Sequence, residues 1–144
     1  MNRLAFVVLL GATTVLGACR EASSPTPTDA EQAYGTALDA TDAVPVSAIA
    51  AEANRHLGRP VTVDGRIAAV TQDGCALLLA TDEAPPLRVT APRPNDGDSC
   101  GWQVPLDTDG FVVAAGTLRA TNDTLHLSAI GVQVPPFRPS DSPL

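Results

Sequence analysis

Residues 60–70 read PVTVDGRIAAV, and this stretch decides the fold. Large aliphatic side chains alternate there with polar ones, at Val61, Val63 and Ile67. This period of two predicts a strand with one buried face, and Gly65 at its middle predicts a bulge or sharp bend. Residues 111–118, FVVAAGTL, carry Gly116 at the same position of a similar strand. Two long strands that both bend at a glycine favour a small, strongly coiled barrel.

Three further segments have the composition of strands, namely 75–80, 87–90 and 124–134. The long connection 91–109 separates the third strand from the fourth. Five short strands with a long connection at this point match the five-stranded Greek-key barrel called the OB fold. The alternative is an open β-sandwich, for which seven strands are more usual. We therefore expect an all-β, OB-like barrel over residues 45–134.

One short α-helix is expected before the strands. Its apolar side chains recur at helical spacing, at Val46, Ile49, Ala50, Ala53 and Leu57. Ser47 is the expected N-cap, Gly58 lies just past the end, and Pro60 prevents continuation. After the last strand, the proline-rich residues 135–144 are expected to fray.

The N-terminus, MNRLAFVVLLGATTVLGAC, has the charge, apolar run and small residues of a secretory signal peptide. Its ending, Leu16-Gly17-Ala18-Cys19, resembles the lipobox of bacterial lipoproteins. This resemblance implies removal of residues 1–18, diacylglycerol on the Cys19 sulfur and acylation of the new amino group. The mature protein is then anchored on the periplasmic side of the bacterial envelope, and Arg20 favours the outer membrane. The alternative is an ordinary signal peptide cleaved nearby, with Cys19 as a free thiol.

Residues 19–44 are expected to be a disordered tether that begins at the lipidated cysteine. The segment is rich in Ser, Thr, Pro, Ala and acidic residues, with only Tyr34 and Leu38 as sizeable apolar side chains. Such a composition buries too little surface to offset the entropy of ordering the chain.

Cys75 and Cys100 form an even pair once Cys19 is lipidated, and an oxidising compartment favours a disulfide between them. Free thiols and a metal site are the alternatives. Zinc needs four ligands, and the two histidines, His56 and His126, stand at no ligand spacing from these cysteines. No metal and no other cofactor is expected.

Two side chains are candidates for contact with a ligand or partner. Trp102, the only tryptophan, either covers an open barrel end, which we favour, or forms an exposed anchor. His126 alternates with apolar residues and therefore shares a strand face with Thr124 and Ser128, which is either the solvated face or the face that lines a groove. The Asp107–Gly110 segment resembles the start of a calcium loop without its later ligands, so it is interpreted as a turn.

The domain also resembles a group of uncharacterised periplasmic and lipoprotein OB-like domains of bacteria. The matching segments are Leu57–Gly65, Gly74-Cys75, Trp102–Pro105 and Gly110. Thr71 stands where that group has the first of two cysteines in a turn. Ala76 stands where that group has a tryptophan. The resemblance implies an OB-like fold in the bacterial envelope and no particular reaction.

Composition and the absence of catalytic motifs reduce the number of function classes to consider. The net charge of −7, the absence of lysine and an aromatic content of 3% argue against a nucleic-acid partner. No G-x-S-x-G motif and no glycine-rich phosphate loop is present, so an enzyme is not expected. The prediction is a non-enzymatic binding or adaptor domain for an unknown periplasmic protein or small ligand. The alternative is a metal- or haem-handling periplasmic OB protein.

The lipid anchor is directly testable. Cys19→Ser removes the sulfur that would carry diacylglycerol, so we expect the protein to leave the membrane fraction and to lose labelling by an alkyne fatty acid. The wild-type chain is the control. Continued membrane association and labelling of the variant would show that Cys19 is not the attachment point.

Overall fold

The computed structural model describes residues 31–94, 97 and 99–135, so the predictions for the signal peptide 1–18, for Cys19 and for residues 136–144 lie outside it. Its elements in chain order are β1 (Gln32–Gly35), β2 (Val44–Pro45), α1 (Val46–Ala51), α2 (Ala53–His56), β3 (Pro60–Val70), β4 (Ala76–Leu79), β5 (Leu87–Thr90), β6 (Phe111–Thr121) and β7 (Thr124–Val134). Five of the strands, β3 to β7, are those expected from the sequence.

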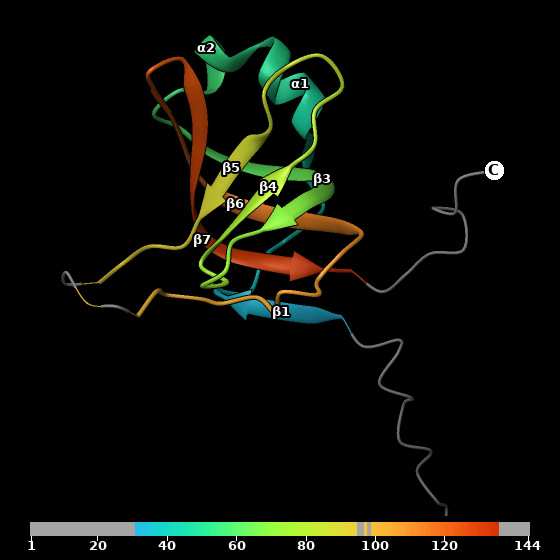
Figure 1. The fold of residues 1–144 in the computed structure, drawn as a ribbon. Helices are drawn as coiled ribbons and strands as arrows, with labels where there is room; N and C mark the ends of the chain where they lie inside the picture. The colour runs from blue at the N-terminus through green and yellow to red at the C-terminus, as the bar shows by residue number, and fades with distance from the viewer. Residues whose placement is uncertain (1–30, 95–96, 98, 136–144) are drawn as a thin grey trace, which may run out of the picture.

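These five strands close into a barrel (Figure 1). Going round it, β3 pairs with β4, β4 with β5, β5 with β7, β7 with β6, and β6 again with β3. Every pair is antiparallel except β5 with β7, which is parallel because the long connection 91–110 carries the chain across to β6. The expected all-β, OB-like five-stranded barrel is therefore confirmed.

The two mid-strand glycines serve different purposes. Gly116 lies at a register shift between β6 and β7, where it allows the bend that was expected. Gly65 lies within an unbroken ladder to β6, and the irregularity of β3 falls between Ile67 and Ala69. The bulge expected at Gly65 is therefore wrong. Gly65 instead leaves room for Val46, whose Cγ1 would lie 2.9 Å from a Cβ at that position.

The barrel interior is aliphatic. Its largest fully buried side chains are Ile49, Val63, Leu77, Leu79, Leu87, Val89, Val112, Leu118, Leu127 and Val132. Helix α1 contributes Val46 and Ile49 and covers one end of the barrel, whereas β1 and the turn between β3 and β4 lie at the other end (Figure 1).

The helical segment differs from expectation in one respect. Instead of a single helix, two short helices meet at Glu52, whose φ of −121° and ψ of 31° are not helical. Pro45 precedes the first helix, and no side chain caps it, so the N-cap expected at Ser47 is wrong. Gly58 does end the segment, with a φ of +73°, and its N–H donates to the Leu118 carbonyl at 2.8 Å.

The expected tether is ordered where it reaches the barrel. Residues 32–35 form β1, which pairs antiparallel with residues 131–134 of β7, and Tyr34 packs against the core. The folded domain therefore begins before residue 45, the boundary expected from the sequence. The reason is that β1 is held mainly by backbone hydrogen bonds to a free strand edge, a contribution that side-chain composition does not reveal.

Gly65 and Gly116 should differ in how well they tolerate substitution by alanine. A Cβ at Gly116 would overlap the backbone carbonyl of Ser128, whereas a Cβ at Gly65 meets side-chain atoms of Val46 and Leu79. We expect Gly116→Ala to lower the free energy of unfolding by about 3 kcal/mol and Gly65→Ala by about 1 kcal/mol. Urea unfolding measures both, and equal losses would contradict this account of the bend.

Candidate functional site

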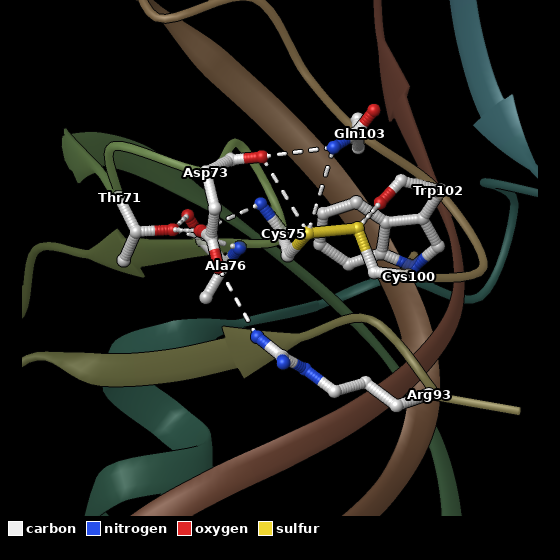
Figure 2. Close-up of polar contacts among 8 residues, drawn as sticks. All are labelled: Thr71, Asp73, Cys75, Ala76, Arg93, Cys100, Trp102 and Gln103. Carbon is white, nitrogen blue, oxygen red and sulfur yellow. Dashed lines mark hydrogen bonds and ion pairs between the residues drawn. A yellow bond between two sulfur atoms is a disulfide. The ribbon is translucent and has the colours of Figure 1, made fainter. Parts of the chain in front are cut away.

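A disulfide fastens the long connection to the barrel. Cys75, at the end of the turn before β4, is bonded to Cys100, with an S–S distance of 2.01 Å and a Cα–Cα distance of 5.8 Å (Figure 2). Backbone bonds on both sides support it, from Ala91 N to Cys75 O at 2.8 Å and from Gly101 N to Pro92 O at 2.7 Å. The structure brings the two cysteines to disulfide distance, as expected from the sequence.

Trp102 lies beside this disulfide and closes the barrel end. Its side chain is 4% exposed, and the indole Nε1–H donates to the Ala129 carbonyl at 2.8 Å. Ala129 follows the part of β7 that pairs with β5 and precedes the part that pairs with β1. The indole thus covers the barrel end, which is the role favoured from the sequence. Because the side chain is buried, the alternative of an exposed anchor for a partner is wrong.

The close approach of β1 to this tryptophan requires a glycine. Gly35 has a φ of +79°, and a Cβ there would lie 3.0 Å from the indole Cδ1. The next residue, Thr36, donates its N–H to the Ile130 carbonyl at 3.1 Å. Along β7, the backbone hydrogen bonds to the β1 segment therefore begin at Ile130, the residue after the one that the indole contacts.

A polar cluster organises the turn between β3 and β4 (Figure 2). The Asp73 carboxylate accepts from the Thr71 hydroxyl at 2.6 Å, from the Cys75 N–H at 3.1 Å and from Arg93 at 3.1 Å. The Thr71 hydroxyl also accepts from the Ala76 N–H at 3.0 Å. These hydrogen bonds, that of Thr71 first, together with the charge of Arg93, hold the pKa of Asp73 below its ordinary value.

This cluster joins the turn to the long connection. The Gln103 side chain donates to the Asp73 backbone carbonyl at 3.1 Å. This hydrogen bond links the turn between β3 and β4 to the long connection that carries Trp102. Sequence reasoning did not identify Asp73 or Arg93. The Thr-x-Asp-Gly order at 71–74 is the available signal, because Asp and Thr side chains bond local backbone N–H groups in turns. Within the described ranges, no three His, Cys, Asp or Glu residues gather to hold a metal ion.

His126 lies on the outer face of the barrel, between two arginines. It is the register partner of Arg88 on β5 and of Arg119 on β6. We call Arg88, His126 and Arg119 the cationic row, after the charge of its two arginines. Because successive side chains of a strand alternate between faces, the residues two positions along form a parallel row on the same face. This hydroxyl row consists of Thr90, Ser128 and Thr117.

The exposure of these side chains agrees with the face assigned to His126. Arg88, Arg119 and Ser128 are exposed, and His126, Thr90 and Thr117 are half-buried, whereas Leu127 is fully buried beneath them. His126 therefore shares an outer face with Ser128, as expected.

The arginines of the cationic row stand outside the ion pairs of the described residues. Those ion pairs join Arg55 to Glu52 and Arg93 to Asp73. Residues 87–90, 117–121 and 124–128, which carry the face, contain no acidic side chain. In a chain with a net charge of −7, this face carries two arginines, and the acidic residue nearest to them along the chain is Asp123 in the turn between β6 and β7.

No protein-family model and no curated protein sequence matches the chain. Among the residues that the structure describes, no helix has the length and apolar character needed to cross a membrane.

The disulfide should carry a large share of the stability. It closes a loop of 25 residues, for which chain entropy gives about 3–4 kcal/mol. We expect denatured, unreduced protein to show no titratable thiol at these two positions in the Cys19→Ser background. Reduction should lower the melting temperature by on the order of 10–20 °C. Two thiols before reduction, or an unchanged melting temperature after it, would contradict the expectation.

Proposed function

We propose that this protein is a lipid-anchored, non-enzymatic binding domain on the periplasmic side of the bacterial envelope. The proposal is supported at the N-terminus by the signal-peptide layout and the lipobox-like ending at Cys19. The Cys75–Cys100 disulfide fits an oxidising compartment outside the cytoplasm. Arg20 favours the outer membrane as the place of attachment.

The observation that carries the binding role is the outer face of β5, β6 and β7. Its cationic row and hydroxyl row present charged groups and hydrogen-bonding groups side by side. All six residues stand on strands of the closed barrel, so their backbone positions are fixed before any partner arrives. Binding groups held on rigid strands lose less entropy on association than groups on loops.

A binding role is favoured over catalysis by where the organised polar groups lie. Asp73 and Arg93 form the best-connected cluster, and their hydrogen bonds hold the turn and the long connection together. His126, in contrast, faces outward between two arginines, a setting suited to contact with an anionic partner.

The proposal is tested by photo-crosslinking in intact cells. A photoreactive phenylalanine analogue replaces Ser128 on the face in one variant and Arg55 on α2 in a control variant. Both positions are exposed, and helix α2 lies at the barrel end, outside the face. We expect a discrete adduct from position 128 that position 55 does not give. The same adduct from both positions, or none from position 128, would overturn the assignment of the face.

A further inference from the structure

The distance between the two arginines of the cationic row sets the size of the ligand that both can contact. Neighbouring strands lie about 4.8 Å apart, so the backbones of Arg88 and Arg119 are separated by roughly 10 Å with His126 midway. An arginine side chain is long enough to reach across one strand. The two guanidinium groups can therefore converge on a single compact ligand above His126.

The donors of the face match phosphate chemistry. A guanidinium presents parallel N–H groups in a fork that fits two oxygens of a phosphate group. The hydroxyls of Thr117 and Ser128 supply further donors one row away, whereas the Thr90 hydroxyl donates to the Leu127 carbonyl at 3.4 Å. A phosphate chain offers more acceptor oxygens and more charge in this span than a single carboxylate, so it can engage both rows.

From this arrangement we propose that the two rows form a site for a small, flexible polyanion that carries two or more phosphate groups. The inference rests on the proposed function and names the ligand class of the same face. No aromatic side chain stands in residues 87–90, 117–121 or 124–128, so the site offers no platform on which a nucleic-acid base would stack.

Charge at longer range favours a compact ligand over an extended anionic surface. At physiological ionic strength charges are screened beyond about 8 Å, so a small ligand at the face responds mainly to the cationic row. An anionic membrane or a nucleic acid would also approach the acidic remainder of a chain with a net charge of −7. The repulsion from that remainder disfavours both.

The test is calorimetric titration of the full mature chain carrying Cys19→Ser with inorganic tripolyphosphate. We expect binding that weakens as NaCl is raised and that falls at least tenfold in Arg88→Ala and in Arg119→Ala. Arg55→Ala is the matched control, because it removes the same charge from α2 and should leave the affinity unchanged. Melting temperatures of all three variants check that the fold is intact, as expected for exposed side chains.

Two further ligands decide the chemical class. Citrate tests carboxylates, and binding as tight as that of tripolyphosphate would overturn the phosphate assignment. Vesicles that contain phosphatidylglycerol test a membrane surface, and row-dependent binding to them in place of tripolyphosphate would overturn the small-ligand assignment. Equal loss of affinity in Arg55→Ala would show that only net charge is being measured.

Failure of this inference can be told apart from failure of the proposed function. A face-specific crosslink from position 128 without binding of tripolyphosphate would overturn the ligand class and leave the binding role in place. Absence of both the crosslink and the binding would overturn both.

Discussion

One edge of β7 must be hydrogen-bonded by three separate parts of the chain, and the rest of the structure depends on how this is achieved. Residues 126–128 pair with β5, and residues 131–134 pair with β1. Between them, the Ala129 carbonyl is satisfied by the Trp102 indole and the Ile130 carbonyl by the Thr36 N–H. A buried carbonyl without a partner is costly, so this junction fixes where the connection after β5 has to run.

The disulfide and the Asp73 cluster can be understood as the means of holding Trp102 at that junction. Cys100 lies two residues before the tryptophan and Gln103 lies directly after it, and both are tied to the turn between β3 and β4. The interior of the barrel is almost entirely aliphatic, and among the described residues the indole is the one fully enclosed aromatic side chain, with Tyr34 packed against the core from β1. A covalent link is well placed to support so small a core, because little apolar surface is available to hold the connection otherwise.

The strands of the barrel were predictable because their side chains alternate and their ends carry turn residues. Residues 60–70, 87–90 and 124–134 match the observed strands β3, β5 and β7. Strand β1 was not predictable, since its stability comes from backbone bonds to a strand 100 residues further along the chain and only Tyr34 adds apolar contact. The break at Glu52 was also hidden, because the apolar spacing on both sides of it continues as in one helix. Of the site residues, the cysteine pair followed from composition, whereas the flanking of His126 by Arg88 and Arg119 depends on strand register that the sequence alone does not specify.

The position of β1 also determines how the barrel responds to mechanical load. Any tension transmitted through residues before 31 enters the domain at Gln32, which is opposite Val134 at the end of β7. A pull directed along the axis of β1 loads its ladder bonds together in shear rather than one after another. The loaded end of the barrel is the one that the disulfide and Trp102 reinforce, while the helices cover the opposite end (Figure 1). A domain held to a membrane through its N-terminus would therefore bear tension at its most cross-linked end.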